Sequence, residues 1–389
     1  MEIVTLGDLF KIGSGGTPSR REKSYYDNGD IPWIKTGDLH KVRIQQASEY
    51  ITQLGLDKSS AKLFPKDTVL LAMYGATIGA CSILDIEAAT NQACAAFVPN
   101  EKVDTNYLYY FLKSKKNDFI RDGVGGAQPN ISATYLKTVD FPFPPLETQK
   151  QIAAVLEKSD QLRKDCQQME QELNNLAQSV FIDMFGDPVT NPKGWDKKEL
   201  LSLCSKVTDG THQSPEWANT GVPFLFISNV RNGKVDFDTG KYITRRCYEE
   251  LTRTSPIEVD DILYTTVGSY GHVALVKDSF PDFCFQRHIA HIKPDPNKII
   301  PEFLYYQLQT SGVKHLADLA VKGIAQKTLN LKDLKKFEMI VPPEDKQLEL
   351  INYMNHQYQA LNELEQMKSE YEMLFNSLMQ KAFKGELDL

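Results

Sequence analysis

The chain has 389 residues, of which 41% are hydrophobic and 24% charged, and its formal net charge is −7. This ordinary globular composition leaves room for two or three domains and excludes a disordered, collagen-like or low-complexity chain. The first residues show no signal-peptide pattern, and the least polar stretch, Val69 to Leu84, is too short to span a bilayer. We therefore expect a cytoplasmic protein that does not enter a membrane.

Metal and enzyme motifs are not evident in the sequence. The six cysteines lie more than ten residues apart, which argues against a CxxC metal site and a disulfide framework, so we expect buried thiols. His288 and His291 fall on one predicted strand, where residues three apart point to opposite faces. A complete phosphate loop, a G-x-S-x-G elbow and an H-E-x-x-H motif are also missing, so we predict neither a catalytic residue nor a metal site.

Residues 1–143 are predicted to form a compact α+β domain. Ile31–Lys35 and Thr68–Met73 are rich in apolar and β-branched residues and are bounded by Gly, Pro or Asp, as strands are. Asn106–Ser114 has the aromatic and leucine spacing of a helix that packs on a sheet. The strands and helices do not alternate regularly, which excludes a βαβ fold.

Residues 144–186 predict one long helix, because Pro and Gly are absent between Pro145 and Gly186. A helix of roughly 40 residues would be ~60 Å long. Apolar positions recur every seven residues in two columns, which are Ile152, Ser159, Cys166, Leu173 and Val180, and then Val155, Leu162, Met169 and Leu176. This spacing predicts a narrow apolar seam that needs a partner helix.

Residues 187–341 and 342–389 repeat this arrangement. Tyr107-Leu-Tyr-Tyr-Phe-Leu recurs as Phe303-Leu-Tyr-Tyr-Gln-Leu, and Phe143-Pro-Pro recurs as Val341-Pro-Pro. The repeat places a strand at Phe224–Ser228 and a helix at Glu302–Gln309. The second long helix keeps the heptad register at an offset of 198 residues, with the columns Leu350, Gln357, Leu364, Tyr371 and Leu378, and Tyr353, Ala360, Met367 and Leu374. We predict that the two helices pair and that Ser159 and Gln357 fix their register.

The acidity of the chain is confined to the two predicted helices. Residues 146–188 carry a net charge of −4 and residues 342–389 one of −5, whereas residues 1–145 are neutral and residues 189–341 carry +2. The charge of the two predicted domains therefore permits contact with phosphate but does not by itself indicate it.

These features resemble the specificity (S) subunit of type I restriction–modification systems. The resemblance covers essentially the whole chain. It rests on Ser14-Gly-Gly-Thr-Pro-Ser, Gly29-Asp-Ile-Pro-Trp-Ile-Lys-Thr-Gly-Asp, Pro144-Pro-Leu-Glu-Thr-Gln-Lys-Gln-Ile, Phe185-Gly-Asp-Pro and Leu378-Met-Gln-Lys-Ala-Phe-Lys-Gly-Glu-Leu. The resemblance implies an α+β fold in which two pseudo-symmetric α/β target-recognition domains are joined by two long antiparallel helices that form a coiled-coil spacer.

The resemblance also implies a function and partners. Each domain would read one part of a split target in double-stranded DNA, and the helices would set the spacer and dock two modification subunits. Those subunits would carry S-adenosylmethionine and methylate adenine, and motor-nuclease subunits would add cleavage, so this chain would hold no cofactor and would not catalyse. The alternative is a coiled-coil adaptor that binds proteins through its two repeated domains, which the repeat and the heptads alone would also fit.

The residues predicted to contact DNA lie in loops at matching places in the two halves. Base readout needs paired donors and acceptors, and phosphate contact needs basic side chains, hydroxyl groups or the N–H groups of Gly-rich turns, although ordinary polar turns carry the same residues. In the first domain the candidates are Lys35, Thr36, Gly37, Asp38, Tyr74, Thr77, Asn91, Gln92, Gln128 and Asn130. In the second domain they are Ser228, Asn229, Arg231, Thr266, Ser269, Tyr270, Arg287, Lys322, Gln326 and Lys327. Among these, Lys35, Gln128, Arg287 and Gln326 are the strongest candidates.

Overall fold

The computed structural model describes residues 2–125, 129–231, 233–323 and 327–389. The chain divides into two compact units, of which unit 1 comprises Met1–Gln167 and Glu365–Leu389, and unit 2 comprises Gln168–Leu364. Each unit therefore contains one mixed domain together with part of each long helix. Within the described residues, no helix has the length and apolar character that a membrane crossing requires.

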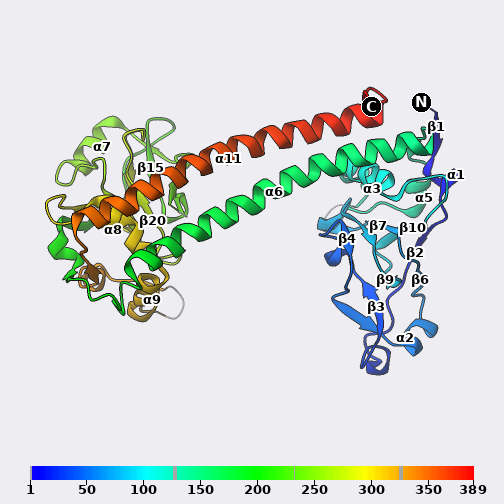
Figure 1. Cartoon of the computed structure of the whole chain (residues 1–389), viewed down its shortest axis with the longest axis horizontal. Helices are drawn as coiled ribbons and strands as arrows, with labels where there is room; N and C mark the ends of the chain where they lie inside the picture. The colour runs from blue at the N-terminus through cyan, green and yellow to red at the C-terminus, as the bar shows by residue number, and fades with distance from the viewer. Residues whose placement is uncertain (1, 126–128, 232, 324–326) are drawn as a thin grey trace. The chain divides into compact units, whose positions relative to one another are not determined.

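The domain of unit 1 contains two larger sheets (Figure 1). The five-stranded sheet has the order β2-β10-β7-β8-β4, with β2 (Ile12–Ser14), β4 (Arg43–Ile44), β7 (Val69–Ala72), β8 (Cys81–Leu84) and β10 (Cys94–Phe97). The four-stranded sheet has the order β5-β3-β9-β6, with β3 (Ile31–Ile34), β5 (Glu49–Ile51), β6 (Leu63–Phe64) and β9 (Ala88–Thr90). Buried Phe64 and Leu70 join the two sheets in one apolar cluster.

Short helices surround these sheets, and one of them is buried. The helices are α1 (Leu6–Leu9), α2 (Gln53–Asp57), α3 (Thr105–Ser114), α4 (Lys116–Asp122) and α5 (Ala133–Lys137), while β1 (Ile3–Thr5) pairs with β11 (Asp140–Pro142). Helix α3 buries six consecutive residues from Tyr107 to Leu112, because it is covered by the sheet on one side and by the long helices on the other. Asp104 caps this helix by accepting a hydrogen bond from the Tyr107 N–H at 2.9 Å.

Unit 2 repeats this design. One sheet has the order β13-β22-β19-β20, with β13 (Cys204–Asp209), β19 (Ile262–Thr265), β20 (Val273–Leu275) and β22 (Ile289–Pro294). The other has the order β14-β18-β15-β21, with β14 (Trp217–Ala218), β15 (Val222–Leu225), β18 (Tyr242–Ile243) and β21 (Cys284–Phe285). Two further pairs are β12 (Lys197–Glu199) with β23 (Glu338–Ile340), and β16 (Val230–Arg231) with β17 (Lys234–Val235). The helices are α7 (Arg245–Thr252), α8 (Pro301–Leu308), α9 (Ser311–Ala320) and α10 (Leu331–Leu334).

The sheet order confirms two repeated α+β domains. The antiparallel series β2-β10-β7-β8 corresponds to β13-β22-β19-β20, and the parallel pair β3/β9 corresponds to the parallel pair β15/β21. One predicted strand is misplaced, since the strand expected over Phe224–Ser228 spans Val222–Leu225. It ends at Leu225 because the Asn229 side chain accepts a hydrogen bond from the Phe226 N–H at 2.9 Å and closes a 3₁₀ turn. The six cysteines are free and buried, as expected.

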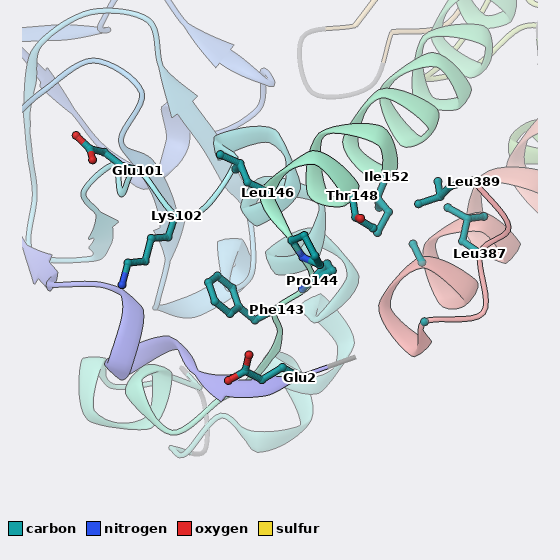
Figure 2. A pocket seen from close by; sticks show the side chains of 13 residues that line it. Glu2, Glu101, Lys102, Phe143, Pro144, Leu146, Thr148, Ile152, Leu387 and Leu389 are labelled. Atoms are coloured by element: carbon teal, nitrogen blue, oxygen red, sulfur yellow. The ribbon is translucent and has the colours of Figure 1, made fainter.

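The two long helices, α6 (Leu146–Phe185) and α11 (Glu344–Lys384), are antiparallel within each unit. In unit 1, Arg163 of α6 forms an ion pair with Glu372 of α11 at 2.8 Å. Ile152, near the start of α6, lines a hollow of about 720 Å³ (Figure 2), and Ala382, near the end of α11, lines the same hollow. In unit 2, Gln357 donates a hydrogen bond to the Leu173 carbonyl. Higher residue numbers on one helix thus meet lower numbers on the other. Of the two polar residues predicted to fix the register, Gln357 bridges the helices, whereas the buried Ser159 hydroxyl has no hydrogen-bond partner among the described residues.

Only one of the two predicted heptad columns lies in the helix seam. Ile152 and Cys166 are 3% exposed, as predicted, but Met169 is 50% exposed and Met367 is 42% exposed. The buried positions lie one residue further on and include Leu156, Met354, Phe375 and Ala382, which pack into the apolar cores of the two domains. The prediction is wrong for the second column because both flanks of the first column are apolar at several levels, as at Val155 and Leu156, so the sequence does not tell which flank is buried.

A buried glutamine fixes each long helix to its domain. The Gln149 side chain accepts a hydrogen bond from the Asp104 N–H at 3.0 Å and donates one to the Pro144 carbonyl at 2.8 Å. The Gln347 side chain does the same with the Ile300 N–H at 3.0 Å and the Pro342 carbonyl at 2.8 Å. Asp104 and Ile300 are the capping residues of α3 and α8, so the glutamine joins the start of each long helix to the start of the buried one.

Candidate nucleic-acid interface

In unit 1 the candidate residues begin where two parallel strands end. Because β3 and β9 are parallel, their carboxyl ends lie at the same edge of the sheet, where Lys35–Asp38 and Asn91–Gln92 follow them. The Asn91 N–H donates to the Ile34 carbonyl at 3.0 Å, which holds the two loops side by side. We call this place the strand edge, and it exposes polar side chains above a buried sheet.

Lys35 at this edge has a carboxylate partner. Its amine pairs with Glu49 at 2.5 Å, and its N–H donates to Asp38 at 2.9 Å. The hydrogen bond from Lys35, together with one from Arg20, holds the pKa of the Glu49 carboxyl below its usual value, so Glu49 is ionised at neutral pH. A DNA contact by Lys35 must therefore share the lysine with Glu49 or displace it. Thr36 and Asp38 are half-buried, and Gly37 is exposed.

A second loop group lies beside the strand edge. The turn after β7 holds Tyr74, which is 42% exposed, and Thr77, whose hydroxyl donates to the Tyr74 carbonyl at 3.1 Å. The Met73 N–H donates to the Ala93 carbonyl at 2.8 Å, which places this turn next to the loop with Asn91 and Gln92. A bridge between Tyr74 and exposed Asn130 brings in the Gly-rich loop. Gln128 lies outside the described residues.

Unit 2 has the same strand edge after β15 and β21, with other side chains. The Gln286 N–H donates to the Leu225 carbonyl at 3.1 Å, just as Asn91 does to Ile34. Ser228 and Arg287 are exposed at this edge. The Asn229 side chain is buried and closes the turn instead of facing outward.

The matching turn of unit 2 follows β19. The Thr266 N–H and hydroxyl both donate to the His288 carbonyl, at 2.9 Å and 3.0 Å, so the turn is joined to the strand edge and the Thr266 side chain is buried. Ser269 is exposed, and the Tyr270 hydroxyl donates to Asp318 at 2.6 Å.

The loop that contains Lys327 is joined to the turn after β19 by a backbone hydrogen bond, in which the Gly268 N–H donates to the Lys327 carbonyl at 2.8 Å. Lys327 is exposed, and exposed Lys322 lies 3.7 Å from Asp333. Gln326 lies outside the described residues. Exposed Arg231 is on the separate two-stranded ribbon β16/β17.

The sequence reasoning missed several residues at these edges. In unit 1 the Thr17 hydroxyl donates to Gln92 at 2.5 Å. In unit 2 the Arg287 Nε–H donates to the His288 Nε2 at 3.4 Å, and partial burial with the nearby charges of Arg287 and His212 lowers the pKa of His288. A glycine two residues before each of Thr17 and His212 is the sequence feature that could have identified them. These glycines, Gly15 and Gly210, pack at matching places against the ends of β9 and β21.

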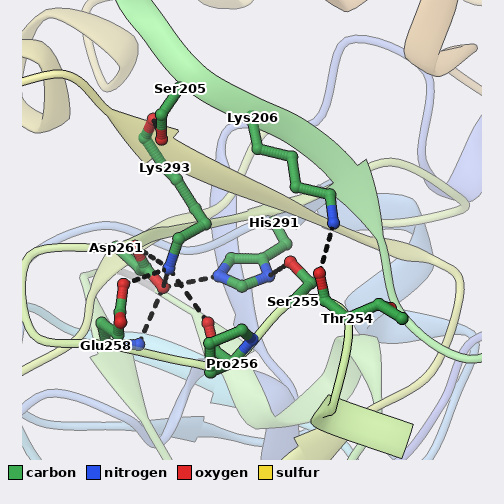
Figure 3. A network of polar contacts seen from close by, with 9 residues as sticks. All are labelled: Ser205, Lys206, Thr254, Ser255, Pro256, Glu258, Asp261, His291 and Lys293. Atoms are coloured by element: carbon green, nitrogen blue, oxygen red, sulfur yellow. Dashed lines mark hydrogen bonds and ion pairs between the residues drawn. The ribbon is translucent and has the colours of Figure 1, made fainter.

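A polar network in unit 2 contains the Ser, His and Asp residue types of a hydrolase triad, but it is buried and has a lysine paired with its aspartate (Figure 3). His291 lies between Asp261, at 2.6 Å, and the Ser255 hydroxyl, at 3.3 Å. Lys293 also pairs with Asp261 at 2.8 Å, and the imidazole is only 2% exposed. These contacts hold the loop before β19 against β22. In the described ranges, three or more His, Cys, Asp or Glu side chains never gather as a metal ion would need.

Comparisons with known proteins agree on one family. The model of the type I restriction modification DNA specificity domain matches residues 1–175 and again residues 192–373. The chain is 27% identical to the type I restriction enzyme MjaIX specificity subunit of Methanocaldococcus jannaschii, over 88% of this chain and 83% of that protein. It is 22% identical to the EcoKI specificity subunit of Escherichia coli, over 96% and 86%.

A solved structure from a type I restriction–modification system shares the fold of the chain. The TM-score is 0.63 at 16% identity, and the match covers 99% of this chain and 98% of that one.

The glycines behind the strand edges give a test of their geometry. A Cβ atom at Gly15 would lie 1.8 Å from the Thr90 carbonyl oxygen, whereas one at Gly37 would meet nothing within 4 Å. We expect Gly15→Ala to lower the free energy of unfolding by about 1–3 kcal/mol, because backbone must move. The matched control Gly37→Ala should change it by less than about 0.5 kcal/mol. Urea denaturation of the purified chain measures both, and equal midpoints for the two variants would contradict the packing described.

Proposed function

This chain belongs to the family of type I restriction–modification DNA specificity subunits, and we propose that each of its two domains reads one half of a split, asymmetric target in double-stranded DNA. The observation that carries the proposal is the duplicated strand edge with unlike side chains. Lys35 at the first edge is replaced by Phe226 at the second, and Asn91-Gln92 by Gln286-Arg287. Equivalent loops with different hydrogen-bonding groups suit two readers of two different base sequences. The comparisons give no support to the alternative, an adaptor that binds only proteins.

The proposal predicts that the two halves of the target are separable. Replacing residues 1–143 with the corresponding domain of a relative should change one half of the methylated motif and leave the other half as it was. The reciprocal exchange of residues 187–341 should change the other half. A genome-wide adenine-methylation map of cells that express the chain with its modification subunits measures both. Joint change of the two halves in either exchange would contradict independent readers.

The partners proposed for the helices are two modification subunits. The second heptad column, left outside the seam, exposes apolar side chains on both helices. Its exposed members are Val155, Met169, Leu176, Tyr353, Met367 and Leu374. An apolar column of this kind on a paired helix is the surface that a further helix packs against. Unit 1 holds Val155, Met367 and Leu374 of this column, and unit 2 holds the other three, so each unit has its own docking surface.

The same proposal assigns the chemistry to the partners. The modification subunits would bind S-adenosylmethionine and methylate adenine, and motor-nuclease subunits would cleave DNA. The chain itself would contribute recognition and no catalytic group, in the cytoplasm.

The docking surface can be tested with charge. Met367→Glu combined with Leu374→Glu should weaken assembly with the modification subunit more than tenfold, because a carboxylate without a partner is costly to bury. The fold should be retained, since both side chains are exposed, at 42% and 44%. Ser369→Glu with Asn376→Glu adds the same charge at exposed polar positions seven residues apart and is the matched control. Copurification and light scattering give the result, and equal assembly of the two double variants would count against this docking site.

We further propose that the long helices set the spacer between the half-sites. Four residues inserted after Gln167 and four after Leu364 fall at the division between the units, so the contacts within each unit are kept. Each helix gains about 6 Å. We expect the non-specific spacer of the methylated motif to lengthen by one or two base pairs, with the same bases read. An unchanged spacer, or new half-site bases, would refute this role of the helices.

A further inference from the structure

A charged side chain lies on an aromatic pair beside the strand edge of unit 1. The guanidinium carbon of Arg20 is 4.5 Å from the centre of the Tyr26 ring and 5.0 Å from that of Trp33. The two rings meet edge to face at 6.2 Å. Both are fixed by hydrogen bonds, since the Trp33 Nε1–H donates to the Gly16 carbonyl at 3.0 Å and the Tyr26 hydroxyl donates to the Pro18 carbonyl at 2.6 Å.

Arg20 is therefore ordered and yet open to solvent. The Glu49 carboxylate forms an ion pair with the Arg20 guanidinium at 2.6 Å, so the aromatic rings and the carboxylate hold the Arg20 side chain on two sides. The side chain is still 53% exposed. An arginine held in this way has already lost most of its side-chain freedom, so less entropy is lost when it binds a ligand.

We call this arrangement, a cation held over a pair of aromatic rings, a platform. Unit 2 has a similar platform formed by different residues. The rings of Trp217 and Phe224 meet edge to face at 5.1 Å, and the amine of Lys241 lies 5.5 Å from the Trp217 ring. Trp217 is 43% exposed, which is unusual for a tryptophan without a partner. Trp217 lies six residues before the strand proline Pro223, just as Tyr26 lies six residues before Pro32.

The charged residues at the two platforms differ. Tyr50 pairs with Pro32 and Tyr242 with Pro223, so Lys241 occupies in unit 2 the place that Glu49 occupies in unit 1. Lys35 is replaced by Phe226. In unit 1 the Arg20 and Lys35 cations face the Glu49 carboxylate, and in unit 2 the Lys241 amine lies over the Trp217 ring. A cation is therefore held on the aromatic rings of both units, although the residue and its position in the chain differ.

We propose that Arg20 and Lys241 are base-reading residues, each of which donates hydrogen bonds to a guanine in the half-site of its own domain. The inference rests on the proposed function and adds residues that the strand-edge candidates did not include. A guanidinium or ammonium group suits the two acceptors, O6 and N7, that guanine presents in the major groove. The rings orient the cation, and Glu49 limits Arg20 to donors that point away from the carboxylate.

The test uses the methyltransferase assembled from this chain and its modification subunits. The wild-type motif is first mapped by methylation, and binding is then measured to duplexes in which each guanine of the first half-site is replaced in turn. Arg20→Gln should reduce discrimination at one guanine roughly tenfold to a hundredfold and leave the second half-site unchanged. Lys241→Gln should have the corresponding effect in the second half-site only.

Three further variants separate reading from folding and from charge. Arg20→Lys keeps the charge and a place over the rings but lacks the planar fork of donors, so discrimination should fall less than in Arg20→Gln while affinity for unrelated DNA is kept. Arg21→Gln and Arg246→Gln remove equal charge at exposed positions and should leave both half-sites unchanged. Unaltered discrimination in both Arg20 variants would overturn the inference, as would equal weakening on every duplex, which marks a phosphate contact. A wild-type complex without a split motif would instead contradict the proposed function itself.

Discussion

The structure depends on the buried glutamine that starts each long helix. A side-chain amide can satisfy a backbone N–H and a carbonyl at once, and Gln149 and Gln347 each do so between a Pro-Pro corner and the cap of a buried helix. Removing such a group leaves buried backbone atoms unpaired, at a cost of about 1–3 kcal/mol each. Two matching joints therefore fix the direction in which each helix leaves its own domain, and the pairing of the helices within each unit builds on that direction.

Much of this architecture could be read from the sequence, because it is local or repeated. The helices at Asn106–Ser114 and Glu302–Gln309, and the two long helices, follow from spacing within single segments. The side of the helix seam could not be read, because Val155 and Leu156 are both apolar and only the position of the partner helix distinguishes them. The early end of the strand at Leu225 depends on one side chain, Asn229, that hydrogen-bonds three residues back.

The candidate interface was predictable as a set of loops and much less so as a set of side chains. The sequence predicted that these loops occupy matching places in the two halves, and the structure shows that they converge because parallel strands share a carboxyl edge. Polar residues in those loops have unequal roles, since Thr266 bonds to a neighbouring backbone and Lys35 is held by Glu49, fourteen residues away. Arg20 was missed because its significance comes from Tyr26, Trp33 and Glu49 together, and no local motif contains all four.

The division of the long helices between the units has a consequence for folding. Phe375, Met379 and Ala382, from the last part of the chain, complete the apolar core of the first domain, and Phe181 and Phe185 of the first repeat complete that of the second. The first core cannot close until the last helix has been synthesised, whereas the buried residues of the second core all lie between Phe181 and Met354. A chain cut between the repeats would separate each core from a helix segment that completes it.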